Sequence, residues 1–372
     1  MTSHKDGFAR LKRDDFVSPQ GLDYIEFYVG NAHQAAYFYR TAFGFAPVAY
    51  AGLETGERDR VSFVMEQGQI RLILTSATTP EGQIAEHVQL HGDGVKDIAF
   101  VVDDVMQAFD LAVKHGATPV MEPSTFEDRG SRLIKASIAT CGHTIHSLIH
   151  RDGAQRAFFP QYRPITKAPQ AVSTGLKSVD HIAISVEKGT LGQWIDFYKN
   201  VLGFHQSHQE DIFTEYSAMN SKVVQSSNGK IKFPMMEPAL GKRKSQIEEY
   251  LEFNRGPGTQ HVAFLSDNIV ETVRLLRKND IDFLHSPETY YQMLENRIGK
   301  INEGVDSLRE LDILADRDQW GYLLQIFSKP LQCRPTLFVE IIQRVGARGF
   351  GSGNIRALFE AVEREQAMRG NI

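Results

Sequence analysis

Three residues in the second half of the sequence carry side chains that could bind one metal ion together. They are His181 in the stretch SVDHIAISV, His261 in TQHVAF and Glu340 in LFVEIIQR. Two imidazoles and one carboxylate on one face leave about three coordination positions open, which is the arrangement of non-haem Fe(II) oxygenases. That chemistry needs two positions for a chelating 2-oxo acid and one for O2. The two histidines lie 80 residues apart and Glu340 a further 79, so no local motif marks the site.

The sequence repeats itself, and the repeat singles out the same three positions. GLDYIEFYV from Gly21 matches SVDHIAISV from Ser178, VKDIAF from Val95 matches TQHVAF from Thr259, and SLIHR at 147–151 matches EIIQR at 340–344. Where the second copy has His181, His261 and Glu340, the first copy has Tyr24, Asp97 and Ser147. A metal site that is kept in one copy and lost from the other explains all three differences together.

Each candidate ligand also has a purely structural interpretation. A lone histidine on an apolar strand, such as His181, is typical of a buried core residue that has found a partner. Glu340 needs a partner as well, because an unpaired carboxylate among apolar side chains is costly. That partner is either a cation held with the two histidines or an arginine, Arg344 or Arg356. The residues alone leave both alternatives open.

The repeated segments predict the architecture that must position these residues. Each segment is an alternating strand, a helix with apolar residues three and four apart, and a return to a strand. The chain therefore divides into two tandem halves, each made of two such modules, in an α+β fold with strongly curved sheets. We expect an iron-free first half at 1–151, an irregular linker at 152–176 that is rich in proline, and a catalytic half at 177–372. Cupped sheets leave an internal cavity for a ligand.

Composition narrows the class of protein. The 372 residues carry a formal net charge of -5, which argues against nucleic acid as a partner because phosphate binding needs a basic face. The sequence has no apolar run long enough to span a membrane and no apolar signal core near its start. Its two cysteines, Cys141 and Cys333, lie at no metal-like spacing and suit a reducing cytoplasm.

The stretch QIFSKPLQCRPTLFVEIIQRVGARGFGSGNIRALFEAVEREQAMRGN, from Gln325 to Asn371, identifies a family. Here and along nearly the whole chain, the sequence resembles the 4-hydroxyphenylpyruvate dioxygenase family of the vicinal oxygen chelate superfamily. The resemblance implies βαβββ modules with cupped sheets, Fe(II) bound by His181, His261 and Glu340, and no catalytic residue beyond these ligands. It implies 4-hydroxyphenylpyruvate and O2 as substrates. It also implies a first half that serves structure and assembly into a homo-oligomer, a dimer or tetramer.

The resemblance also implies a substrate pocket, residue by residue. Polar groups around the keto acid and the ring correspond to Ser221, Gln246, Gln260 and Gln325, and pocket aromatics to Phe327 and Phe338. The alternatives are plain core packing for the two phenylalanines and a surface location for the glutamines, except Gln260, which adjoins a ligand.

The last helix is predicted from the residues themselves. Asn354 is a natural N-cap, and an apolar stripe follows it, formed by Ile355, Leu358, Phe359 and Val362. Three glycines precede the helix, at 349, 351 and 353, so a hinged segment carries a one-faced helix onto an apolar surface. Ordinary core packing would account for the stripe. The functional interpretation is a lid over the pocket that excludes water.

Two pocket positions bear on the product. Homogentisate-forming members usually have phenylalanine at the position of Ile355 and asparagine at that of Met236. Isoleucine cannot stack on a substrate ring opposite Phe327, and methionine cannot hold a polar ring substituent. Both departures resemble the 4-hydroxymandelate synthase branch, so 4-hydroxymandelate is the predicted product. Met236, Asn354 and Ile355 are therefore predicted to be substrate-binding residues as well. Pro234 agrees instead with homogentisate formation, which is the alternative; a metal-free protein that binds small aromatics is a remote alternative.

Overall fold

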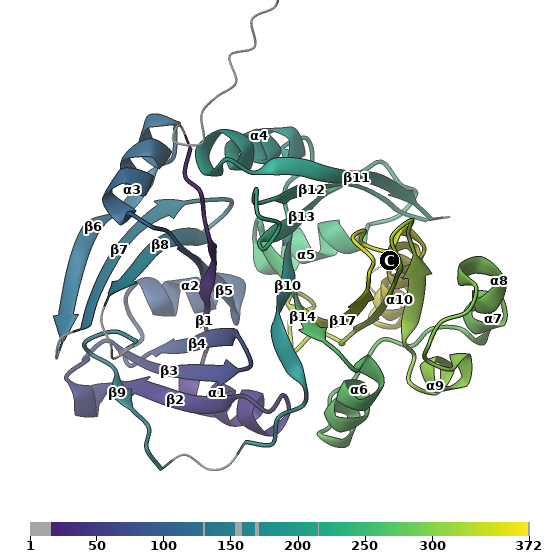
Figure 1. Ribbon diagram of the computed structural model, residues 1–372, viewed down its shortest axis with the longest axis horizontal. Coiled ribbons are helices and arrows are strands. Elements are labelled where there is room, and N and C mark those ends of the chain that lie inside the picture. Colours follow the sequence, from purple (N-terminus) through teal and green to yellow (C-terminus); the bar gives the residue numbers. More distant parts are fainter. Residues whose placement is uncertain (1–15, 129–130, 153–157, 168–170, 215, 371–372) are drawn as a thin grey trace, which may run out of the picture.

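The computed structural model describes residues 16–128, 131–152, 158–167, 171–214 and 216–370 (Figure 1). The first half forms one curved sheet of nine strands in the order β6-β7-β8-β5-β1-β4-β3-β2-β9. Its elements are β1 (Gly21–Tyr28), α1 (Ala32–Thr41), β2 (Ala46–Ala51), the short 3-10 turn η2 (Leu53–Thr55), β3 (Arg60–Gln67), β4 (Ile70–Ala77), α2 (Gln83–His91), β5 (Gly94–Val101), α3 (Val105–Lys114), β6 (Pro119–Asp128), β7 (Ser131–Ala139), β8 (Ile145–Asp152) and β9 (Arg163–Pro164).

The second half forms a sheet of eight strands in the order β11-β12-β13-β10-β14-β17-β16-β15. Its elements are β10 (Leu176–Ser185), α4 (Leu191–Leu202), β11 (His205–Phe213), β12 (Ala218–Gln225), β13 (Lys232–Pro238), α5 (Gln246–Asn254), β14 (Gly258–Ser266), α6 (Ile269–Lys278), α7 (Glu288–Gln292), α8 (Leu294–Ile298), α9 (Val305–Glu310), β15 (Leu314–Arg317), β16 (Tyr322–Phe327), β17 (Phe338–Val345) and α10 (Ser352–Met368).

The two sheets repeat one topology. In the first half β1 pairs antiparallel with β5 and parallel with β4, and β5 pairs parallel with β8. In the second half β10 pairs antiparallel with β14 and parallel with β13, and β14 pairs parallel with β17. Each half is thus a pair of βαβββ modules joined at their first strands. The predicted α+β fold with tandem modules and a C-terminal helix is confirmed.

Local sequence signals explain where the repeated helices begin. The side chain of Asn31 accepts a hydrogen bond from the third backbone N–H of α1, and Asp104 and Asn268 do the same for α3 and α6. Each of these residues satisfies a donor that the first helical turn leaves free. Each helix then buries an apolar stripe against its sheet, as the spacing of three and four residues predicts.

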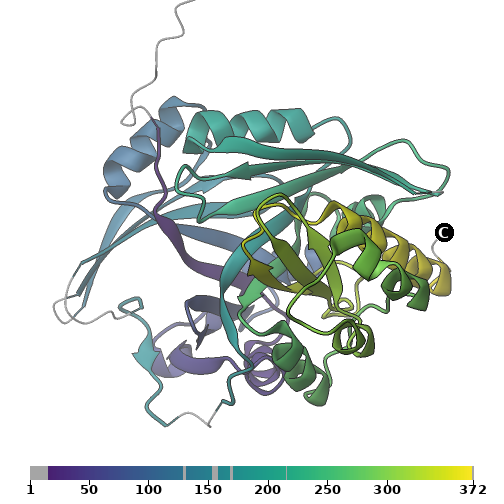
Figure 2. The same ribbon diagram turned by 45° about the vertical axis from the view of Figure 1, so that its right-hand side comes forward.

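The two halves lie side by side, as Figure 2 shows, and buried apolar residues of both form one continuous core. Phe45 of the first half lies 5.9 Å from Phe264 of the second, measured between ring centroids. His146, on β8, is fully buried, and its Nε2 atom lies 2.9 Å from the Tyr198 hydroxyl on α4. The other ring nitrogen, Nδ1, contacts the Ile98 carbonyl at 3.1 Å, so His146 is held from both halves.

The stretch between the halves contributes more than a connection. β9 lies within the predicted linker and pairs with β2 through Ala49 and Tyr50. Phe158 and Phe159 of the same stretch pack edge-on against Tyr24 inside the first sheet. Both cysteines are free thiols. No helix in the described part of the chain is long and apolar enough to cross a membrane.

Candidate metal centre and substrate pocket

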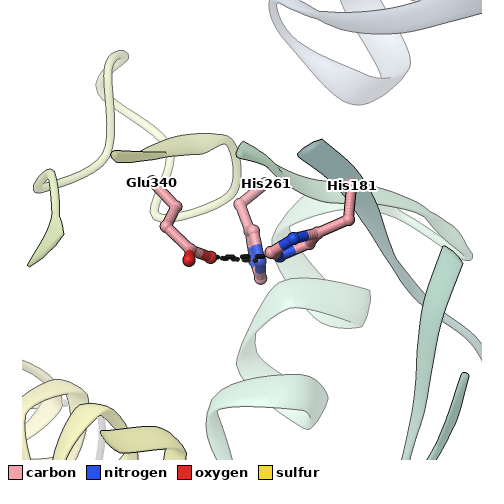
Figure 3. Close-up of side chains that lie close together, drawn as sticks. All are labelled: His181, His261 and Glu340. Atoms are coloured by element: carbon pink, nitrogen blue, oxygen red, sulfur yellow. Dashed lines mark ion pairs between the residues drawn. The ribbon is translucent and has the colours of Figure 1, made fainter. Parts of the chain in front are cut away.

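Strand register brings the three predicted ligands to one face of the second sheet. Ala263 on β14 pairs with His181 on β10 at one side and with Glu340 on β17 at the other. His261 precedes Ala263 by two residues, so its side chain points to the same face. The small side chain of Ala263 lies at the centre of this row. Figure 3 shows the three side chains converging from their separate strands.

The distances between the donor atoms suit a single ion. The Nε2 atoms of His181 and His261 lie 3.1 Å and 3.4 Å from the same Glu340 oxygen, Oε2. Ligand atoms of the three residues all lie within 4.8 Å of one another. Neighbouring ligands around an octahedral ion with bonds of about 2.1 Å are about 3 Å apart. All three residues are buried, so the donors would bind an ion away from bulk water.

The electrostatics of the three residues favour a positive charge beside Glu340. Burial alone would raise the pKa of Glu340, but the charge and hydrogen bonds of His181 and His261 lower that pKa to about 2. Burial lowers the pKa of His261. Burial would also lower the pKa of His181, yet the carboxylates of Glu340 and Asp180 raise it. The centre therefore holds a carboxylate, and a cation can compensate this buried charge.

Asp180, which was not among the predicted site residues, orients His181. The Nδ1 atom of His181 lies 2.8 Å from Asp180 Oδ1, which makes Nδ1 the donor and leaves Nε2 free to bind a metal. Neighbouring strand residues normally point to opposite faces, but the pairing of β10 with β14 shifts register between Val179 and His181. Arg344 holds Asp180 with two hydrogen bonds, of 2.7 Å and 2.8 Å.

The repeat contains a signal for this pair. Asp23 and Arg151, the matching residues of the first half, form the same paired contact, at 2.8 Å and 2.9 Å. The Asp–Arg pair is thus common to both halves, whereas the three ligand positions differ. Among the described residues, the ion pairs of Glu340 are with the two histidines, because Arg344 is bound to Asp180 and Arg356 to Glu360. The arginine alternative for Glu340 is wrong.

A lysine lies among the matching residues of the first half. The Lys135 ammonium group lies 2.9 Å from the Tyr24 hydroxyl and 3.4 Å from Asp97 Oδ2. Asp97 also accepts hydrogen bonds from the Tyr24 hydroxyl at 2.9 Å and from the Ser147 backbone N–H at 3.0 Å. The ammonium group of Lys135 therefore neutralises the buried Asp97 carboxylate in the first half.

Both predicted pocket aromatics contact the ring of a candidate ligand. Phe338 stacks on the His261 ring at 4.8 Å between centroids, and Phe327 meets the same ring edge-on at 6.2 Å. Phe327 pairs with Glu340 across β16 and β17, which places it in the row of ligands. Gln246 and Gln260 are buried and line a small cavity of about 30 Å³ with Phe338. Ser221 pairs with Met236 across β12 and β13.

The prediction that Asn354 caps the last helix is wrong. Helix α10 begins at Ser352, and its N-cap is Gly351, which has a left-handed φ of 76°. Asn354 lies inside the first turn and is fully buried. Its side-chain Nδ2 donates to Gln325 Oε1 at 2.9 Å, so a partner distant in sequence uses the amide that a local cap would need. In the apolar stripe, Leu358 and Phe359 are buried, and Ile355 and Val362 are half-buried.

Comparison with known proteins identifies the family. Residues 21–134 and 178–326 match the Glyoxalase/Bleomycin resistance protein/Dioxygenase superfamily. The chain is 45% identical to a 4-hydroxyphenylpyruvate dioxygenase of Yarrowia lipolytica, over 95% of this chain and 94% of that protein. It is 42% identical to a 4-hydroxyphenylpyruvate dioxygenase of Danio rerio, over 100% of this chain and 96% of that protein. A solved structure, a triple mutant of 4-hydroxymandelate synthase from Streptomyces coelicolor, is 38% identical with a TM-score of 0.86, over 94% of this chain and 100% of that one.

The chain belongs to the 4-hydroxyphenylpyruvate dioxygenase family. The predicted family is confirmed, and so is the enzyme class, a non-haem Fe(II) dioxygenase of the 2-oxo-acid type. The predicted cofactor, Fe(II), agrees with the donors present, since two imidazoles and a carboxylate with no thiolate are the set that this class uses. These relatives do not support the remote alternative of a metal-free binding protein.

The two residues on which the product prediction rests, Met236 and Ile355, belong to one apolar cluster. Met236 belongs to an apolar cluster with Ala183, Met219 and Phe359, and Ile355 packs against the same cluster. Met236 on β13 and Ile355 on α10 therefore lie at the same apolar cluster. A second apolar cluster contains Phe327, Phe338 and Leu358, so α10 contacts both clusters.

Proposed function

We propose that the protein oxidatively decarboxylates 4-hydroxyphenylpyruvate with O2 and releases homogentisate. One observation carries the proposal: His181, His261 and Glu340 converge in a chain that is 42–45% identical to 4-hydroxyphenylpyruvate dioxygenases over nearly its full length. The prediction of 4-hydroxymandelate as the main product is not confirmed, because these relatives favour the alternative that was predicted beside it.

Bound Fe(II) would supply the centre at which the 2-oxo acid and O2 meet and exchange electrons. In the proposed reaction the bond between the carboxylate carbon and the keto carbon breaks, and CO2 leaves. One oxygen atom of O2 enters the new carboxylate. The other becomes a ring hydroxyl, while the side chain moves to the neighbouring ring carbon. The atoms and electrons of 4-hydroxyphenylpyruvate and O2 thus equal those of homogentisate and CO2, and no other reductant is needed.

The chain's own residues prepare the ligands. Gln325 Nε2 donates to Glu340 Oε1 at 2.9 Å and leaves Oε2, the oxygen that both histidines face, for the metal. Asp180 keeps the proton of His181 on Nδ1, which leaves the Nε2 lone pair toward the centre. Such supporting hydrogen bonds to ligands are typically worth about 10–100-fold in metal affinity.

The last helix separates the centre from water. Polar contacts hold α10 and its C-cap, among them Asn354 to Gln325, Glu363 to Thr214 at 2.6 Å, and Arg369 to Glu249 at 2.7 Å. Its apolar side chains Leu358 and Phe359 fill the space between these contacts. An enclosed pocket favours reaction with the bound substrate over side reactions with water.

A specific observation favours a second candidate product, 4-hydroxymandelate. The side chains of Met236 and Ile355 are aliphatic, so these two positions offer neither a ring to stack on the substrate nor an amide to hold a ring substituent. A substrate ring that can turn would present its benzylic C–H instead of a ring carbon. A displacement of about 1 Å changes rates by orders of magnitude, so two side chains could change the product and leave the shared steps intact.

The decisive experiment identifies the product. The iron-loaded protein is incubated with 4-hydroxyphenylpyruvate and O2, with a Glu340→Ala preparation as the control. Homogentisate and 4-hydroxymandelate are isomers of equal mass, so chromatographic retention and the aromatic proton pattern in NMR must separate them. Homogentisate as the main product supports the proposal, 4-hydroxymandelate supports the second candidate, and no consumption of the keto acid would reject both.

We further propose that the protein acts in the cytoplasm as a homo-oligomer, and that the first half, which lacks the metal ligands, serves assembly. Support for this part comes from the composition and the family resemblance alone. Size-exclusion chromatography with light scattering of the purified chain tests the assembly.

A further inference from the structure

An insertion distinguishes the half that carries the metal ligands. The first half passes from α3, which ends at Lys114, directly to β6, which begins at Pro119. At the matching place the second half inserts α7, α8 and α9 between α6 and β15. Figure 1 shows these helices together at the outer edge of the second half. Two residues of the insertion, Tyr290 and Arg297, reach inward to β15 and the lid helix.

A chain of hydrogen bonds connects Tyr290 to the metal centre. The Tyr290 hydroxyl lies 2.7 Å from Asn354 Oδ1 on α10. Asn354 Nδ2 lies 2.9 Å from Gln325 Oε1, and Gln325 Nε2 lies 2.9 Å from Glu340 Oε1. A carboxylate can only accept, so Gln325 must direct its NH2 group to Glu340 and its oxygen to Asn354. Asn354 must in turn present its NH2 group to Gln325 and its oxygen to Tyr290. The charge on Glu340 thus determines the direction of every bond.

The surroundings of Tyr290 fix the first link of this chain. Its oxygen accepts the Ala315 backbone N–H at 2.9 Å and an Arg297 guanidinium N–H at 2.6 Å, which occupies both lone pairs. The single hydroxyl proton can go to Asn354 Oδ1 or to the Ala315 carbonyl, at 2.9 Å. That carbonyl already accepts Arg297 Nη2 at 2.6 Å. The proton is therefore best placed on the bond to Asn354.

The backbone beside Asn354 is tied to the same region. The Gly353 N–H donates to Asp316 Oδ2 on β15 at 2.8 Å. A methyl group added at Gly353 would lie 3.1 Å from an Arg297 guanidinium nitrogen, so the first turn of α10 packs closely on the insertion.

We propose that Tyr290 is a positioning residue that latches α10 over the metal centre and orients Gln325 toward Glu340. The insertion is the support of this latch, and Arg297 fixes the hydroxyl that forms it. Closing the lid and completing the hydrogen bonds of Glu340 are then one event, since both depend on the Asn354 amide. The consequence during turnover rests on the proposed function, whereas the latch is a property of the folded chain.

The test replaces Tyr290 with phenylalanine and uses the neighbouring tyrosine as a matched control. Tyr290→Phe removes one oxygen and leaves Asn354 Oδ1 buried without its donor. Tyr291 is also buried, but its hydroxyl lies outside this chain of hydrogen bonds, so Tyr291→Phe makes the same chemical change without touching the latch. Arg297→Gln is a second variant that weakens the latch from outside, in case Tyr290→Phe folds poorly.

The first readout needs neither metal nor substrate. Amide hydrogen exchange of peptides covering 350–368 is measured in the iron-free protein. We expect about tenfold faster exchange in the first turns of α10 for Tyr290→Phe, a smaller increase for Arg297→Gln, and a change below about twofold for Tyr291→Phe. Equal exchange in Tyr290→Phe and Tyr291→Phe would overturn the latch.

Two further readouts test the link to the centre. Competition with a chelator should show Fe(II) binding about tenfold weaker in Tyr290→Phe, the lower end of the effect of supporting hydrogen bonds, and unchanged in Tyr291→Phe. The ratio of O2 consumed to product formed should rise at least about twofold. Unchanged Fe(II) affinity together with an unchanged ratio would overturn the link. If the unmodified protein formed neither product while Tyr290→Phe still loosened α10, the proposed function would fail and the latch would stand.

Discussion

Replacing Gly351 with alanine should loosen the lid for two separable reasons. Gly351 is the N-cap of α10 and has φ 76° and ψ 69°, a left-handed conformation that disfavours a side chain. A methyl group there would also lie 2.5 Å from Gln325 Oε1 and 3.3 Å from Asn354 Nδ2. The new carbon would therefore press on the hydrogen bond that joins the lid to the residue supporting Glu340.

The two costs can be estimated. A non-glycine residue in the left-handed region costs about 1–2 kcal/mol. Displacing the buried amide pair and leaving its polar atoms unpaired costs about a further 1–3 kcal/mol. Gly189→Ala is a control for the first cost alone, because Gly189 has φ 82° and nothing lies within 4 Å of the added methyl. The difference between the two variants therefore isolates the effect on Gln325 and Asn354.

Urea unfolding of the iron-free variants measures this difference. The unfolding free energy of Gly351→Ala should fall below that of Gly189→Ala by about 1–3 kcal/mol, at similar m-values. Gly351→Ala alone should also consume O2 in excess of product, since water reaches an incompletely closed centre. Equal destabilisation in the two variants, with normal coupling in both, would refute the assignment of Gly351 to the lid contact.

Four further outcomes are expected. His181→Ala, His261→Ala and Glu340→Ala should each lose bound iron and O2 uptake, as elemental analysis and an oxygen electrode would show; near-normal turnover in any of them would remove that residue from the ligand set. Alanine at Tyr24, Asp97 or Ser147 should lower stability but keep activity per folded, iron-loaded chain, and a selective loss of turnover would contradict this. Ile355→Phe should raise the share of ring-hydroxylated product and lower total activity, because a larger side chain must fit a packed site; an unchanged product ratio on chromatography would count against the role of Ile355. Burial lowers the pKa of His146 to about 4, below the value of about 6.5 in an unfolded chain. The contribution of His146 to the unfolding free energy should therefore be complete above about pH 6.5 and fall by about 2 kcal/mol at pH 5. His146→Gln should reduce this loss in pH-dependent unfolding.

The sequence predicted the modules and the ligand candidates because both leave traces at matching positions. Strand and helix periodicity recurs in all four modules, and the change from Tyr24, Asp97 and Ser147 to His181, His261 and Glu340 is visible once the halves are aligned. The pair of Asp180 and Arg344 left a trace as well, in Asp23 and Arg151, but a pair that does not change between the halves gives no contrast to notice.

Other features depend on contacts between elements far apart in the sequence. The insertion that carries Tyr290 has no counterpart in the first half, so the repeat cannot indicate what it contacts. Asn354 shows the limit of local rules, because asparagine before an apolar stripe is a good N-cap. Its side chain instead hydrogen-bonds to Gln325 on β16, and the helix begins three residues earlier than that cap would place it. A tertiary hydrogen bond in a buried site outweighs a cap that solvent could also satisfy.

The product and the closure of the lid depend on adjacent residues. Asn354 joins α10 to Gln325, and Ile355, the next residue, packs against the cluster of Met236 and Phe359. A helix fixes the angle between neighbouring side chains, so we expect the bonds of Asn354 to determine how Ile355 packs against this cluster. Under the proposed function, we expect the steps up to CO2 release to depend on the ligands and on Gln325. We expect the choice of the carbon that is hydroxylated to depend on Met236 and Ile355. Overall identity to the relatives reflects the whole chain and gives these two residues little weight. Product analysis of Ile355→Phe beside the unmodified protein therefore tests the one property on which the pocket and the relatives disagree.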